Sequence, residues 1–227
     1  VNRSESMSWY EGSTLLYTLE TIHIGSDHNH IDCRFPVQTV IRPQTDEHHD
    51  YRGYAGRVAG GGMKKGDEVT LLPTGFTTKI AKIETYDGEI EEAFPPMSVT
   101  VHIEDDYDLS RGDMIVRTNN QPEVNQDLDM MVCWFSPTPL QVNGKYTIMH
   151  TTQEARCVVK DIQYKLDINS LHRDLEDKTI KMNDIARVVV RTTKPLFTDE
   201  YRKNRITGSI ILVDERTNNT VGAGMLI

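Results

Sequence analysis

A glycine-rich stretch followed by two lysines is the first pattern in this chain that could bind a phosphate. Residues 60–62 are all glycine, and Lys64 and Lys65 follow them closely. Phosphate-binding loops, however, have the spacing Gly-x-x-x-x-Gly-Lys-Ser/Thr or Gly-x-Gly-x-x-Gly, and neither occurs anywhere in the chain. Glycine also reaches positive φ without a Cβ clash. We therefore interpret residues 60–62 as a tight turn between two strands, with a second turn at 64–67.

Histidines near a cysteine could bind a metal ion. His28, His30 and Cys33 are spaced His-x-His-x-x-Cys, and further histidines stand at positions 23, 48 and 49. This spacing is not typical of zinc sites, and most of these residues fall in polar stretches that resemble loops. A stand-alone enzyme with a metal site in these loops stays open as an alternative. Solvated loop histidines are the interpretation we favour, and we assign no metal ligand.

The cysteines and an acidic run offer two further candidates. Cys33, Cys133 and Cys157 are odd in number and lack a Cys-x-x-Cys motif, which is typical of buried thiols in a reducing cytoplasm. A catalytic cysteine would have no local signature here, and we assign no catalytic residue. The run 104–108 holds four carboxylates that could bind a cation. No calcium-loop spacing accompanies them, so a solvated loop is the favoured interpretation.

One basic patch stands out near the C-terminus. Tyr201, Arg202, Lys203 and Arg205 lie within five residues of one another. They form either a solvated loop or a docking surface for an acidic partner or a nucleotide. Together with Arg57 they are our predicted partner or domain interface.

The composition limits the classes of function. The 227 residues contain 25 Lys and Arg against 34 Asp and Glu, which gives a net charge of −9. An acidic surface repels phosphate backbones, so we expect no nucleic-acid partner. No apolar run approaches the ~20 residues that span a bilayer, and no basic-then-apolar leader opens the chain. We expect a cytoplasmic protein without a membrane partner.

One helix is predicted in the first half of the chain. Ser8 and Glu11 fit a capping box, with Ser8 as the N-cap. Apolar residues then recur at helical spacing at Leu15, Leu16, Leu19 and Ile22. Such a helix needs a surface to pack on, which would be either the following domains or a domain outside this sequence.

The remainder of the chain is predicted to be all-β. From Phe35 onward, short alternating runs are separated by turn residues, which is typical of a closed antiparallel barrel. The polar stretch 118–127 is predicted to be a short linker, and a second set of strands follows it, with one helical turn at 171–177. We expect two tandem closed antiparallel β-barrels after a terminal helix, with domain boundaries at 1–30, 31–118 and 126–227.

The sequences of several segments resemble those of the barrel domains of elongation-factor-Tu-type GTPases. Residues 34–38, 51–58 and 66–69 resemble the second domain of these proteins, and the ending Thr-Val-Gly-Ala-Gly at 220–224 is shared with elongation factor Tu. Asn-Arg-Ile-Thr-Gly-Ser at 204–209 and Thr-Asn-Asn at 217–219 are more similar to the large subunit of bacterial GTP-dependent sulfate adenylyltransferases. The resemblance runs from about residue 9 to residue 227.

This resemblance implies a fold and a role. The family's large subunit is a GTPase domain followed by two barrels, and residues 9–16 resemble the segment that ends the GTPase domain. GTP hydrolysis there helps a catalytic subunit to make adenylyl sulfate and pyrophosphate from ATP and sulfate. The GTP-binding motifs are missing here, so we expect a non-catalytic C-terminal portion without its own cofactor. GTP and Mg would belong to the missing G domain.

The implied partners are the catalytic subunit and the G domain of the same protein. The barrels would form one rigid body against which the G domain docks differently with GTP and with GDP. The alternative is a β-barrel module of a translation-factor-like GTPase that binds RNA or protein. The acidic charge and the lack of interleaved aromatic and basic residues disfavour RNA.

Overall fold

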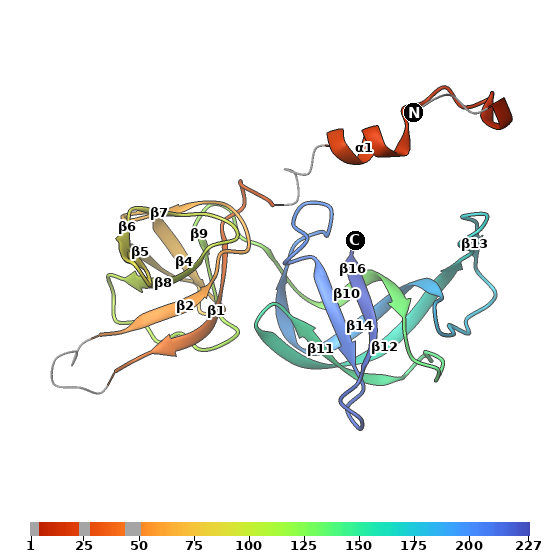
Figure 1. The fold of residues 1–227 in the computed structure, drawn as a ribbon. Helices are drawn as coiled ribbons and strands as arrows, with labels where there is room; N and C mark the ends of the chain where they lie inside the picture. The colour runs from red at the N-terminus through yellow and green to blue at the C-terminus, as the bar shows by residue number, and fades with distance from the viewer. Residues whose placement is uncertain (1–4, 23–27, 44–50) are drawn as a thin grey trace.

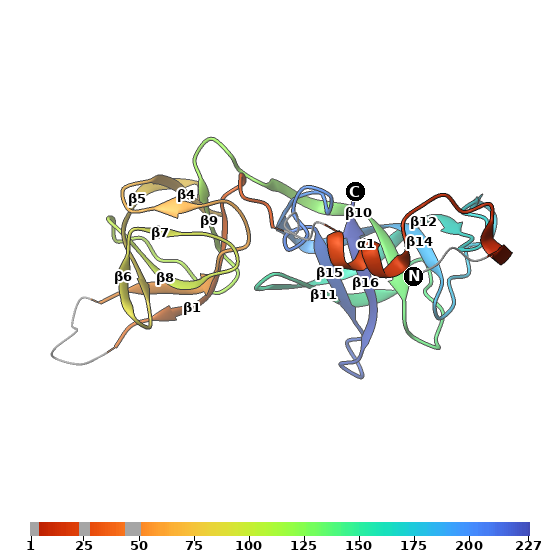
Figure 2. The ribbon, with the colours of Figure 1, turned by 45° about the horizontal axis from the view of Figure 1, so that its top comes forward.

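Two antiparallel β-barrels follow one another along the chain in the computed structural model, which describes residues 5–22, 28–43 and 51–227 (Figure 1). In each barrel a seven-stranded sheet closes on itself through one additional strand pairing. Figure 2, turned by 45°, shows the same two bodies side by side. The predicted all-β class with two tandem closed barrels is confirmed.

The first barrel uses the strand order β4-β9-β1-β2-β8-β5-β6, and a β4–β5 pairing closes it. Its turns follow the predicted chemistry, because Gly61, Gly66, Gly88 and Gly112 all adopt positive φ. The strands, with the short β3–β7 pair, are β1 (Arg34–Ile41), β2 (Gly53–Arg57), β3 (Met63–Lys64), β4 (Glu68–Leu72), β5 (Phe76–Thr85), β6 (Gly88–Ile90), β7 (Glu92–Ala93), β8 (Ser98–Ile103) and β9 (Met114–Arg117).

The second barrel uses the order β11-β15-β16-β10-β14-β12-β13 and is closed by β11–β12. Two of its glycines allow close packing, because a Cβ atom at Gly222 would lie 3.0 Å from the Trp134 ring and one at Gly224 2.6 Å from the Met130 sulfur. The strands are β10 (Glu123–Trp134), β11 (Lys145–His150), β12 (Gln153–Leu166), β13 (Arg173–Asp174), β14 (Ile185–Thr198), β15 (Ser209–Val213) and β16 (Thr220–Leu226).

Alternation along the strands fills one core per barrel. On β10, Leu128, Met130, Val132 and Trp134 are buried while the intervening residues are not. Residues such as Phe35, Tyr54, Ile80 and Val101 form the separate core of the first barrel. This period of two is the pattern that the sequence shows.

Two local predictions were wrong. Strand β13 and its turn occupy the segment 171–177 in place of a helical turn, because residues 173–174 pair with the end of β12. Strand β10 begins at Glu123, so the polar connection between the sheets is shorter than the predicted linker.

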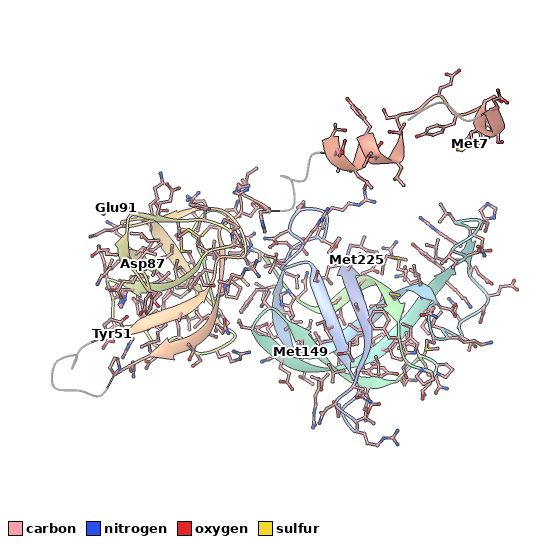
Figure 3. The ribbon with its side chains drawn as sticks, viewed as in Figure 1. Met7, Tyr51, Asp87, Glu91, Met149 and Met225 are labelled. Atoms are coloured by element: carbon pink, nitrogen blue, oxygen red, sulfur yellow. The ribbon has the colours of Figure 1, made fainter. Side chains whose placement is uncertain are left out.

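The predicted helix exists, but it begins later than expected. A short 3₁₀ turn, η1 (Glu5–Met7), precedes α1 (Leu15–Thr21), whose N-cap is Thr14 and not Ser8. The Thr14 hydroxyl accepts a hydrogen bond from the Tyr17 amide at 3.2 Å. The apolar face of α1 packs on nothing in the described part of the chain, because Leu15 and Leu19 are 75% and 65% exposed. In Figure 3, Met7 likewise lies far from both barrels.

Candidate functional site

A buried ion pair joins the two barrels. Arg34 begins β1 in the first barrel, and Asp199 follows β14 in the second. The Arg34 Nε and Nη2 atoms donate to the two Asp199 carboxylate oxygens at 2.9 and 2.8 Å, and the side chains are only 2% and 9% exposed. This two-pronged geometry is the strongest that arginine and carboxylate adopt. It fixes the orientation of the segment after β14 against the first barrel.

Two asparagines and Asp32 complete the surroundings of Arg34. Its Nη1 atom donates to the backbone oxygen of Asn120 at 2.7 Å and to the Asn120 side-chain oxygen at 3.0 Å. Asn120 in turn donates to Asp32 at 2.7 Å, and Asn29 donates both to Asp32 and to the Lys203 backbone oxygen. Burial alone would raise the pKa of Asp32, but the hydrogen bonds from Asn120 and Asn29, together with the charges of Arg34 and Lys203, lower it.

The Asn-Arg-Ile-Thr-Gly-Ser segment supplies the other half of this contact. Asn204 is 2% exposed, and its Nδ2 atom donates to the Ala59 carbonyl oxygen of the first barrel at 3.1 Å. The Thr207 hydroxyl donates to Asp199 at 2.6 Å, and His150 Nε2 donates to the Thr207 carbonyl oxygen at 2.7 Å. We call Arg34, Asn120, Asp199, Asn204 and Thr207 the inter-barrel network.

The glycine run at residues 60–62 lies next to the inter-barrel network. Gly61 has φ +59°, as a turn would require, and a Cβ atom there would lie 2.5 Å from the Cys33 amide nitrogen. A Cβ atom at Gly60 would lie 2.7 Å from Asn204 Nδ2. The run is therefore the turn that we expected from the missing phosphate-loop spacing. It also lets the backbone approach the second barrel.

An apolar cluster extends the contact between the barrels. Leu72, Met114 and Val116 of the first barrel form one buried cluster with Phe197 of the second. Burying such side chains contributes about 1.5–3 kcal/mol each. Charged and apolar contacts between the barrels are therefore both buried.

A cleft opens beside the network. It has a volume of about 150 Å³, and residues of both barrels line it: Pro36, Gln38, Arg57, Ala59, Thr151, Thr152 and Ile206. We call it the inter-barrel cleft. Arg57 is exposed there, and its Nε atom donates to the Pro96 carbonyl oxygen at 3.3 Å.

The structure separates the predicted interface residues into two groups. Arg57 lines the inter-barrel cleft at the end of β2. Tyr201, Arg202, Lys203 and Arg205 lie together on the segment between β14 and β15, where Lys203 pairs with Glu200 at 3.2 Å. Ile206 brings this segment to the same cleft as Arg57.

Sequence reasoning missed the residues that make the buried contact. Arg34, Asn204 and Thr207 lie in segments on which the family resemblance was based. The predicted interface, however, was assigned to the cations at 201–205 instead. The only sequence signal for the buried contact was that Asn204 and Thr207 are small polar residues next to turn residues. Nothing local indicates that Arg34 is buried, since its partner is 165 residues away.

The structure also bears on the three other candidate sites: the histidines, the cysteines and the acidic run. Within the described residues, no group of three or more His, Cys, Asp or Glu side chains could hold a metal; positions 23, 48 and 49 lie outside them. Burial raises the pKa of Cys33 to about 11 and of Cys157 to about 12, which makes both poor nucleophiles. The acidic run 104–108 is an exposed loop, as expected, in which Asp106 and Asp108 are 88% and 85% exposed. Its Asp108 pairs with Arg42 at 2.9 Å, and Asp106 pairs with Arg52.

A row of apolar side chains crosses the outer face of the second barrel. Direct strand pairings link its members across five neighbouring strands: Met149 with Ile211, Ile211 with Ala223, Ala223 with Cys133, and Cys133 with Ile185. Met225, on β16 beside Ala223, extends this outer apolar row, and Figure 3 shows Met149 and Met225 on this barrel. Met149, Ile211 and Met225 are 46%, 43% and 40% exposed. Contiguous exposed apolar side chains of this kind mark interaction surfaces.

Curated relatives match the whole chain, and a family model matches its second barrel. Residues 127–227 match the family described as GTP-eEF1A C-terminal domain-like. A bifunctional enzyme CysN/CysC of Mycobacterium tuberculosis is 50% identical over the full chain, which covers 37% of that relative. Sulfate adenylyltransferase subunit 1 of Bacteroides thetaiotaomicron is 45% identical, with 48% of its length covered. The chain thus spans less than half of these curated relatives.

A solved structure of sup35 complexed with GDP shares the fold. Its TM-score is 0.77 over 96% of this chain and 52% of that one, at 16% sequence identity. In the described part of the chain, no helix has the length and apolar character needed to cross a bilayer.

Proposed function

Since this chain is homologous over its full length to sulfate adenylyltransferase subunit 1, within the elongation-factor-Tu-like GTPases, we propose that it is the non-catalytic barrel portion of such a subunit. The parent protein would couple GTP hydrolysis to the formation of adenylyl sulfate and pyrophosphate from ATP and sulfate. The observation that carries this proposal is the identity of 45–50%, which extends along the entire chain. The alternative of an RNA-binding translation-factor module has no support in these relatives.

The two barrels act as one rigid body in this proposal. Interfaces between domains of a chain are mobile by default unless they are large and hydrophobic. Here the inter-barrel network and the Phe197 cluster couple the barrels. A rigid body can transmit the nucleotide state of a neighbouring GTPase domain to a distant surface.

The outer apolar row supports a docking role for the second barrel. Its exposed methionines are adaptable side chains that suit a contact which changes between two states. The exposed apolar face of α1 also fits a neighbour beyond the described barrels. We assign the outer apolar row to the G domain of the parent and the predicted patch at Arg57 and 201–205 to the catalytic subunit. GTP and Mg would reside in that G domain, and the assembly would be cytoplasmic.

The first test is a mixing experiment with this chain and the catalytic subunit of the same organism. Size exclusion with light scattering should show a 1:1 complex, and Arg202→Glu should weaken it, whereas Lys145→Glu on β11 should not. If no complex forms, the proposal that the catalytic subunit binds to these barrels is contradicted.

The second test uses the full-length subunit. Hydrogen exchange in the GTP and GDP states should differ on β15 and β16, where the outer apolar row lies. Met225→Lys should abolish that difference, while Met182→Lys, at another exposed methionine, should leave it intact. Equal exchange on β15 and β16 in both states would exclude this docking surface. The domain boundaries 31–118 and 126–227 would be tested by expressing each barrel alone.

A further inference from the structure

We propose that the inter-barrel cleft binds a small tetrahedral oxyanion, the class of ligand that includes sulfate and phosphate. Arg57 of the first barrel and the Thr151–Thr152 turn of the second barrel would hold it between them. Four of the lining residues carry side-chain hydrogen-bond donors: Gln38, Arg57, Thr151 and Thr152. The proposal rests on charge, on an unpartnered hydroxyl and on backbone strain at the same place.

The charge at the cleft is unbalanced. Arg57 forms no ion pair within the described part of the chain, although acidic residues outnumber basic ones in this protein. Several other cations of the first barrel have carboxylate partners, as in Lys64 with Glu92 and Lys65 with Glu89. Arg111 adds a second guanidinium beside the cleft, because its Nη1 atom donates to the Gln38 carbonyl oxygen at 3.1 Å. An anion would supply the missing negative charge.

The opposite wall contains a hydrogen-bonding group without a partner. The Thr152 hydroxyl is buried and makes no hydrogen bond in the structure. Buried polar atoms normally find a partner, and an unpaired one costs about 1–3 kcal/mol. A bound oxygen atom in the cleft would give this hydroxyl an acceptor.

The turn itself is strained. Thr151 has φ +49°, in the region that β-branched residues avoid. Asparagine tolerates positive φ, and Asn143, Asn183 and Asn218 also adopt it in this chain. A strained residue that lines a cleft is a reason to look for function at that position. A threonine at this position adds a second hydroxyl to the wall of the cleft.

The placement of the donors selects the shape of the anion. Arg57 belongs to the first barrel and the two threonines to the second, so the donors reach the cleft from both barrels. A carboxylate presents both of its oxygens in one direction, so it would contact the donors of only one barrel. A tetrahedral anion presents oxygens in several directions and can contact both walls, and a cleft of about 150 Å³ has room for it.

The test is a titration of the full 227-residue chain with sodium sulfate, followed by amide NMR at constant ionic strength maintained with sodium chloride. We expect saturable shifts at Thr151, Thr152 and neighbouring amides. Arg57→Gln should weaken the binding about tenfold or more, because it removes a charged donor, and Thr152→Val should weaken it about threefold. Lys79→Gln, which removes another exposed cation of the same barrel, is the matched control and should bind like the original chain.

Three outcomes would overturn the proposal. The first is the lack of saturable shifts up to about 50 mM sulfate. The second is sulfate binding that Arg57→Gln leaves unchanged. The third is sodium acetate binding as tightly as sulfate in a parallel titration, which would make the cleft a carboxylate site.

Discussion

At the scale of single residues, Arg34 and Asp199 form a buried ion pair between the two barrels. Removing one partner of a buried ion pair leaves an uncompensated charge and typically costs 3–5 kcal/mol. We therefore expect Asp199→Asn to lower the free energy of unfolding by about that amount, measured by urea denaturation.

The chain offers a matched control for this prediction. Asp127 pairs with Arg191 at 2.9 Å, but the two side chains are 57% and 50% exposed. Exposed pairs contribute at most about 1 kcal/mol, so Asp127→Asn should change the stability little. If the two variants unfold at the same urea concentration, the Arg34–Asp199 pair does not stabilise the protein as described.

His150 makes the stability of the protein depend on pH. Its Nε2 atom donates to Thr207 and its buried Nδ1 atom has no partner, so the ring is held neutral. Burial lowers the pKa of His150 below 6.5, and the hydrogen bond to Thr207 only partly opposes this shift. Below pH 6.5 the unfolded chain then takes up a proton that the folded chain does not.

The sign follows from this difference in bound protons. The contribution of His150 is complete above pH 6.5 and declines as the pH falls towards its folded-state pKa, by at most about 1.4 kcal/mol per pH unit. Urea unfolding at pH 7.5, 6.5 and 5.5 should show this loss, and His150→Gln should reduce it. Glu84 does not interfere, because Lys82 and other partners lower its pKa to about 2. Parallel curves for the two proteins would refute the role of His150.

At the scale of elements, the turn at Gly61 is a structural requirement of the contact between the barrels. Gly61→Ala would place a Cβ atom 2.5 Å from the Cys33 amide at φ +59°, whereas Gly66 has φ +85° and open space around it. We expect Gly66→Ala to cost about 1 kcal/mol from backbone strain alone, and Gly61→Ala to cost roughly 2 kcal/mol more because the backbone must move. Chemical denaturation of the two variants measures the difference, and equal losses would show that the close approach is not required.

The elements also show what could be predicted from the sequence. Strands such as β8 and β10 have a clear alternation of apolar and polar residues, so their existence and burial followed from the pattern. The start of α1 could not be predicted from the sequence, because both Ser8 and Thr14 are acceptable N-caps and only the backbone geometry distinguishes them. The inter-barrel network was not predictable either. Its members are small polar or charged residues far apart in the sequence, and burial of such residues depends on tertiary contacts.

At the scale of the whole molecule, the relation between the barrels is what the structure adds to the family resemblance. Two barrels could be predicted from repeated short strands, and one rigid body was expected, but the residues that join the barrels were not predicted. The inter-barrel network, the Phe197 cluster and the inter-barrel cleft all lie on the surface where the barrels meet. A ligand or a substitution there acts on both barrels at once.

Coupled barrels should unfold as one unit. In scanning calorimetry we expect a single transition whose calorimetric and van't Hoff enthalpies agree. Asp199→Asn combined with Asn204→Ala breaks the ion pair with Arg34 and the hydrogen bond to the Ala59 carbonyl oxygen, and it should split the transition in two. The control, Asp127→Asn with Asn125→Ala, changes only exposed contacts and should keep one transition. Two transitions in the unaltered chain would mean that the barrels are independent, and a rigid-body role in transmitting a nucleotide state would then be excluded.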